Sequence, residues 1–154
     1  MLYARNTLVA VDRSKAEIEQ LLTRYGAKQF ISGWQGNRAA IGFEAYGRRI
    51  RFELPLPGRD DKSIFLTPSG RVKKLNEEKS YKIWEQSCRQ RWRALALVIK
   101  AKLEAVECGI AAFEEEFYAH IIMPGGKTLY QLTKDDVEAA YKTGKAFPML
   151  EFHE

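Results

Sequence analysis

The chain has 154 residues, of which 45% are hydrophobic and 29% charged, and it carries a formal net charge of +5. This length and composition predict one globular domain and exclude a disordered tail, while the weak positive charge favours anionic partners without naming them. No run approaches about 18 apolar residues and the chain starts without the build of a signal peptide, so we expect a cytoplasmic protein that makes no membrane contact.

Cys88 and Cys108 are the only cysteines. Both fall in one predicted helix, where about 1.5 Å per residue places them roughly 30 Å apart. That distance exceeds the reach of a disulfide, and the chain has no CxxC pair. The pattern is typical of a reducing compartment.

The N-terminal region predicts a short strand and then a helix. Residues 7–11 are β-prone and suit an edge strand. Ser14, with Glu17 three positions on, matches a capping box. Apolar residues then repeat at helical spacing up to Gly26, which is typical of the position just after a helix.

Three β segments follow, at residues 28–34, 39–46 and 48–54. Turn residues separate them, which favours an antiparallel meander. In the third segment apolar and charged residues alternate, so one face is buried and the other faces water. The apolar members are Ile50, Phe52 and Leu54, and the charged members are Arg49, Arg51 and Glu53.

Residues 58–75 form an unusually long connection. They contain Gly, Pro, Ser and Asp and a basic run made by Arg71, Lys73 and Lys74. Because passive connections are normally shorter, we expect this segment to be either disordered or functional.

The longest predicted element is a helix over residues 76–109. Residues 80–108 contain no Gly or Pro, Asn76 suits the start of the helix and Gly109 its end. At about 100° per residue one face of the helix is apolar and another is basic. The apolar face holds Tyr81, Trp84, Cys88, Trp92, Leu95, Ile99, Leu103 and Val106, and the basic stripe holds Lys82, Arg89, Arg93 and Lys100.

The C-terminal region predicts a shorter helix over 110–122, a turn at 123–126, a helix capped by Thr133 and ended by Gly144, and an extended tail over 145–154. The predicted fold is therefore α+β. An N-terminal helix and a small antiparallel sheet of three to four strands (1–57) precede the long connection (58–75), the long central helix (76–109) and shorter helices packed back on it (110–154). All of them belong to a single domain, 1–154.

Motifs for catalysis or metal binding are weak. Gly126, Lys127 and Thr128 match the end of a P-loop, but Ile121 stands where that motif needs a glycine. Glu116 and His120 are one helical turn apart, yet a metal needs three or four ligands. Cys88 lies on the apolar face and suits packing better than nucleophilic attack. We expect no metal, no cofactor and no enzymatic activity.

The basic residues point more clearly to a ligand. Arginine suits bidentate contacts to phosphate, and exposed aromatic rings can stack on a base. Charged residues on a long helix also serve solubility and surface ion pairs, so this alternative stays open. The predicted phosphate contacts are Arg89, Arg93, Lys100, Arg49, Arg51 and Lys82, and the predicted stacking residues are Trp34, Tyr46 and Tyr81.

Five segments carry a resemblance to a known family: residues 14–25 (SKAEIEQLLTRY), 47–57 (GRRIRFELPLP), 89–107 (RQRWRALALVIKAKLEAVE), 113–120 (FEEEFYAH) and 124–128 (PGGKT). On these segments, which cover most of the chain, the protein resembles a widespread family of small phage- and prophage-encoded proteins. The resemblance implies an accessory phage protein of the bacterial host cytoplasm, with no catalytic motif to transfer. By analogy with phage anti-defence proteins, it implies sequestration of a nucleotide immune signal.

These observations predict a non-enzymatic protein that binds a phosphate-bearing small molecule and sequesters it. Two alternatives remain: a nucleic-acid-binding phage protein, and a protein that binds and inhibits a host defence factor through residues 59–75. The long helix carries Trp84, Trp92 and the apolar run 94–99, more apolar surface than one thin sheet can cover. We therefore also expect a homo-oligomer formed through the long helix.

Overall fold

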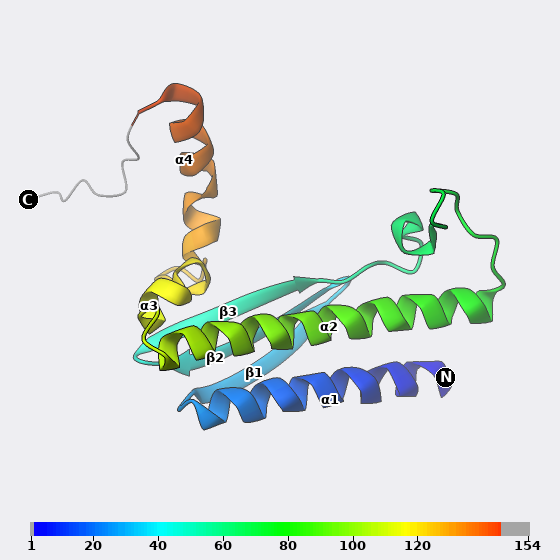
Figure 1. Ribbon diagram of the computed structural model, residues 1–154, viewed down its shortest axis with the longest axis horizontal. Helices are drawn as coiled ribbons and strands as arrows, with labels where there is room; N and C mark the ends of the chain where they lie inside the picture. Colours follow the sequence, from blue (N-terminus) through cyan, green and yellow to red (C-terminus); the bar gives the residue numbers. More distant parts are fainter. Residues whose placement is uncertain (1, 146–154) are drawn as a thin grey trace, which may run out of the picture.

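The computed structural model describes residues 2–145 and confirms an α+β fold. Figure 1 shows two long helices side by side on one face of a three-stranded sheet, with the last helix projecting from one end of the body. The elements in chain order are α1 (Leu2–Arg24), β1 (Lys28–Gln35), β2 (Arg38–Ala45), β3 (Arg48–Pro55), η1 (Lys62–Phe65), α2 (Glu77–Glu107), α3 (Phe113–Glu116), η2 (Tyr118–His120) and α4 (Leu129–Thr143).

The sheet is the predicted antiparallel meander, in the order β1-β2-β3. Tyr46 and Gly47 both adopt positive φ (52° and 73°), which suits the tight turn between β2 and β3. Ile41 pairs with Phe52 across these strands, and both side chains are buried beneath the helices. The charged residues of β3 alternate onto the opposite face, as predicted.

Helix α2 covers the sheet together with α1. Its N-cap is Asn76, whose side-chain oxygen accepts a 2.8 Å hydrogen bond from the backbone N–H of Lys79. At the other end Gly109 adopts φ 74°, as expected for a helix terminator. The predicted apolar face is confirmed as a buried seam, with Cys88, Trp92, Leu95, Ile99 and Leu103 in the core.

Helix α1 is longer than predicted, and the edge strand at 7–11 is wrong. The helix runs unbroken from Leu2 to Arg24, so Ser14 lies in its middle and caps nothing. No Gly or Pro interrupts these residues, and a continuous ladder of helical hydrogen bonds outweighs the weak β preference of 7–11. The predicted end is confirmed, because Gly26 has φ 87° and Ala27 N–H bonds to the Leu22 carbonyl at 2.9 Å.

Residues 59–75 are ordered by η1 and a small hairpin. Phe65 is buried, and its carbonyl accepts a 2.9 Å hydrogen bond from Lys73 N–H. The Arg59 guanidinium lies over the Tyr81 ring at 4.6 Å. Trp84 Nε1–H donates to the Pro57 carbonyl at 2.8 Å. The aromatic first turns of α2 thus hold this segment in place.

The predicted helix over 110–122 is wrong. Only α3 and η2 are helical, and Ile121 pairs with Ile50 as a one-residue extension of the sheet. Phe113, Phe117 and Ile121 are still buried, so the apolar pattern marked the core correctly but not the conformation. Pairing with β3 supplies the backbone hydrogen bonds that a helix would otherwise provide.

Helix α4 begins earlier than predicted. Its N-cap is Thr128, which forms a capping box with Gln131, while Thr133 lies inside the helix. Gly144 ends it with φ 67°, as predicted. The tail predicted over 145–154 lies, apart from residue 145, outside the described residues.

Replacing Ile99 by Ala should destabilise the protein strongly. Ile99 is fully buried in the α2 seam, so the cavity and lost contacts should cost about 2–5 kcal/mol of unfolding free energy in urea, followed by circular dichroism. Gln90→Ala, at an exposed site on the same helix, is the control and should change it by less than about 0.5 kcal/mol. Equal effects of the two substitutions would show that the seam is not the core.

Candidate functional site

The basic stripe predicted on α2 is divided between ion pairs and a groove. Arg89 Nη1 lies 3.1 Å from Glu85 Oε1, and Lys82 Nζ lies 3.5 Å from Glu78 Oε1. Arg93 and Lys100 instead line a groove of about 330 Å³ between α1 and α2. The four residues therefore do not form one phosphate site.

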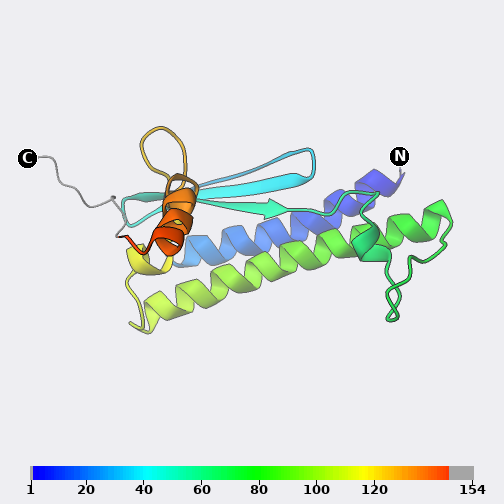
Figure 2. The same cartoon turned by 90° about the horizontal axis from the view of Figure 1, so that it is seen from above.

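The two predicted arginines of β3 lie on the sheet face that points away from the helices. Arg49 is exposed, whereas Arg51 is half-buried and lines a cleft. Figure 2 shows both long helices on one side of the sheet. Arg51 therefore lines a cleft on the other side, apart from Arg93 and Lys100 in the groove between α1 and α2. Of the six predicted phosphate contacts, Arg51 alone lines this cleft.

The predicted stacking residues lie apart from one another. Trp34, at 74% exposure, is at the end of the edge strand β1. Tyr46 stacks on Phe113 with ring centroids 4.6 Å apart, and Tyr81 packs under Arg59. None of the three lines the cleft that contains Arg51.

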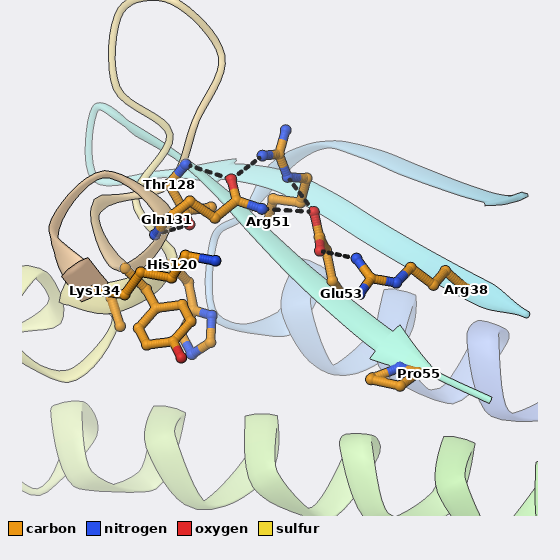
Figure 3. A pocket seen from close by; sticks show the side chains of 10 residues that line it. Arg38, Arg51, Glu53, Pro55, His120, Thr128, Gln131 and Lys134 are labelled. Carbon is orange, nitrogen blue, oxygen red and sulfur yellow. Dashed lines mark hydrogen bonds and ion pairs between the residues drawn. The ribbon is translucent and has the colours of Figure 1, made fainter. Parts of the chain in front are cut away.

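That cleft, of about 580 Å³, lies between the outer face of β3 and the start of α4 (Figure 3). We call it the β3–α4 cleft. It draws on segments that are distant in sequence: the starts of β2 and α4, the second half of β3, and η2. Its lining residues are Arg38, Arg51, Glu53, Pro55, Ala119, His120, Thr128, Tyr130, Gln131 and Lys134.

Gln131 joins the two walls of the cleft. Its side-chain oxygen accepts hydrogen bonds from Arg51 Nη2 at 2.9 Å and from Thr128 N–H at 3.0 Å. Its amide nitrogen donates to Glu53 Oε1 at 3.0 Å. Figure 3 shows this chain of contacts continuing from Glu53 to Arg38. One side chain therefore caps α4 and fixes it to β3.

The cleft has an excess of positive charge. Arg38, Arg51 and Lys134 supply three cations, and Glu53 is the one carboxylate among the described lining residues. Glu53 is shared, with Oε2 3.5 Å from Arg38 Nη1 and Oε1 3.6 Å from Arg51 Nε. Within residues 2–145 no contact engages the Nη1 group of Arg51, which leaves that edge of the guanidinium for a ligand.

Arg51 Nε is buried and has no hydrogen-bond partner. A buried unsatisfied donor is costly, and the Glu53 carboxylate at 3.6 Å compensates for it only through charge. The arginine is thus held in place by its neighbours rather than by an ideal fork-to-fork pair.

His120 forms the floor of the cleft. Its ring stacks on Phe52 at 4.0 Å between centroids. Burial, reinforced by the nearby Lys102 ammonium, lowers the pKa of His120 below its usual 6.5, against the opposing effect of a hydrogen bond with the Arg51 backbone. The imidazole is therefore neutral at pH 7.

Sequence reasoning found Arg51 but missed Arg38, Lys134 and Gln131. The alternation along β3 exposed Arg51, and pairing of the strands places Arg38, at the start of β2, opposite Pro55. The start of α4 was assigned five residues too late, so Gln131 and Lys134 had no predicted place. His120 was considered only with Glu116, which instead accepts from Lys102 Nζ at 3.4 Å.

Metal binding and membrane insertion find no support in the described part of the chain. Among residues 2–145, no three His, Cys, Asp or Glu side chains come together as metal ligands. None of the described helices has a stretch long and apolar enough to span a bilayer. Cys88 is buried, and burial raises the pKa of its thiol, which disfavours the reactive thiolate.

Comparison of the chain with protein-family models, with curated proteins and with solved structures found no match.

Replacing Arg89 by Ala should destabilise the fold by about 1–3 kcal/mol, because the Glu85 carboxylate, only 12% exposed, would lose its partner. Adding Glu85→Gln should recover much of the loss in urea unfolding. Lys82→Ala breaks an exposed pair and should cost less than about 0.5 kcal/mol. A double variant less stable than Arg89→Ala alone would contradict this assignment.

Protein stability should fall as the pH drops below 6.5, in part because of His120. Just below pH 6.5 the His120 imidazole takes up a proton in the unfolded chain but stays neutral in the folded protein, so lower pH favours unfolding. One proton supplies at most about 1.4 kcal/mol per pH unit, and solvent around the half-exposed ring reduces this. His120→Gln should flatten the unfolding free energy between pH 5 and 7. If NMR titration gave the His120 imidazole of the folded protein a pKa above 6.5, its contribution to the pH dependence of stability would have the opposite sign, and this prediction would be wrong.

Proposed function

We propose that the protein binds a small phosphate-bearing ligand in the β3–α4 cleft. The observation that carries this proposal is that Arg38, Arg51 and Lys134 line one open cleft that holds a single carboxylate among its described lining residues. That carboxylate, Glu53, pairs with Arg38 and Arg51, so the cleft keeps an excess of positive charge. A polyanion would balance that charge.

The size of the cleft supports a ligand of nucleotide dimensions. Small-molecule sites usually enclose about 300–1,000 Å³, and the cleft has about 580 Å³. Tyr130, at 61% exposure, stands at its edge and offers a ring face to a base. The free Nη1 edge of Arg51 suits a phosphate oxygen.

We further propose binding without chemical conversion. Both oxygens of Glu53 are engaged, Oε2 by Arg38 and Oε1 by Arg51 and Gln131, so these partners already occupy the position from which a general base would accept a proton. Gln131 and Thr128 are engaged in capping α4. In a phage-encoded accessory protein, such binding would act by sequestering a nucleotide signal of the host.

The proposal is tested first on the protein as purified, by denaturing it and identifying released nucleotides by mass spectrometry. Isothermal titration with ADP and with inorganic pyrophosphate follows. Arg38→Gln with Lys134→Gln should weaken binding at least tenfold, since each removes a charged contact worth about 1 kcal/mol or more.

The matched control removes the same two charges nearby. Arg49 neighbours Arg51 on β3 but is not part of the cleft, and Lys142 lies on α4 in an ion pair with Glu138. Arg49→Gln with Lys142→Gln should leave the affinity for ADP unchanged. Equal weakening in both double variants, or no binding of either probe by the wild type, would overturn the proposal.

Nucleic-acid binding is the second candidate, favoured by the hairpin over residues 66–74. Arg71, Lys73 and Lys74 are exposed on it, and Figure 1 shows it projecting at the end of the body opposite α4. Such residues would contact phosphates without reading sequence. This function would be supported if the protein bound an arbitrary oligonucleotide in a salt-dependent way. The binding should be lost in the Lys73→Gln, Lys74→Gln double variant and kept in the cleft variants.

A further inference from the structure

Helix α2 carries a second apolar surface, on the side opposite its buried seam. Leu97 is 62% exposed and Val98 is 46% exposed, although both lie at the middle of the longest helix. The sheet covers α2 on one side, and Figure 2 shows no element over the middle of the helix on the other. We call this surface the outer stripe, made of Ala94, Leu97, Val98, Ala101 and Ala105.

The outer stripe has the spacing of a coiled-coil seam. Ala94, Val98, Ala101 and Ala105 follow one another at steps of four, three and four residues. Alanine at these positions lets a second helix approach closely. None of these four residues contributes to the buried seam of α2, because the opposite face of the helix fills the core.

The surface beside the stripe is hollowed. The groove of about 330 Å³ between α1 and α2 has Leu21, Ala96 and Leu97 among its lining residues, and its other walls are polar or charged: Glu17, Gln20, Arg24, Arg93 and Lys100. Leu97 therefore stands where the outer stripe meets a mostly polar groove. In an interface through the stripe, this groove would lie at the polar rim.

The charges along α2 select one direction of pairing. Arg91 and Arg93 lie on the N-terminal side of the stripe. Glu104 and Glu107 lie toward its C-terminal end together with Lys100, while the Lys102 ammonium there is 3.4 Å from Glu116 Oε1. In an antiparallel pair the two arginines of one helix meet the part of the other helix that holds both glutamates. In a parallel pair the arginines of the two copies would meet, which is unfavourable.

We propose that two copies of this chain form an antiparallel dimer through the outer stripe, with Val98 of each copy packed on Ala101 of the other. The two sheets then lie on the outside of the dimer. The β3–α4 clefts open on the sheet faces away from α2, so both stay accessible. The dimer does not depend on ligand binding in the cleft.

The test is the molar mass of the full chain by sedimentation equilibrium. The wild type should give twice 17.7 kDa, and Val98→Glu should give the monomer mass with an unchanged circular dichroism spectrum. Val137→Glu is the matched control, because Val137 on α4 is 44% exposed and takes the same substitution. It should remain a dimer. A monomeric wild type, or a dimeric Val98→Glu protein, would overturn the proposal.

Oxidative cross-linking tests the direction of pairing. If Val98 faces Ala101, residue 91 of one copy faces Cys108 of the other, since both pairs share the same midpoint. Arg91→Cys should therefore form a covalent dimer through residues 91 and 108, while the wild type should form none. Cys88 is buried and does not compete. A Cys108–Cys108 link in the wild type would show parallel pairing and overturn the antiparallel one.

Discussion

The packing of the α2 seam on the sheet is the interaction on which the rest of the structure depends. Trp92 and Ile99 are buried at its centre, and the same helix runs from the 59–75 segment at one end to α3 at the other. Ile18 and Leu22 of α1 complete this core from the side. Because a single 31-residue helix makes all these contacts, its position sets the place of every neighbouring element.

Helix α4 is attached by a different kind of interaction. Among its described residues Leu129 alone is buried, and the link to β3 passes through the polar side chain of Gln131. Hydrogen bonds of this kind contribute little net stability but fix direction. The β3–α4 cleft therefore has one wall that belongs to the core and another that is oriented by a few polar contacts. A ligand that bonds to Arg51 would act on the same contacts that orient α4.

The sequence predicted those elements whose reasons are local. The period of 3.6 residues in α2 and the alternation in β3 marked the buried faces correctly, and Gly26, Gly109 and Gly144 marked helix ends. The errors arose where distant residues decide the conformation. Ile121 leaves a helical pattern because β3 offers it a partner, and the capping pattern at Ser14 is overruled by a helix that begins at Leu2.

The candidate site was predictable in part for the same reason. Arg51 was found because the alternation of its own strand exposes it, but Arg38, His120 and Lys134 reach the cleft only through the folding of three separate segments. No spacing in the sequence encodes that meeting. Conversely, Arg89 and Lys82 looked available from helical geometry, yet the carboxylates one turn before them, Glu85 and Glu78, engage them.

Helix α2 thus has two apolar sides and one basic edge, and the fold uses them differently. The side with large residues fills the core, where cavities are costly and shape matters. The side with alanines, Leu97 and Val98 faces water, because the sheet packs against the other side of the helices. A two-layer α+β unit can bury only one face of each helix. The proposed antiparallel dimer would cover this second apolar face of the longest helix with the same face of another copy.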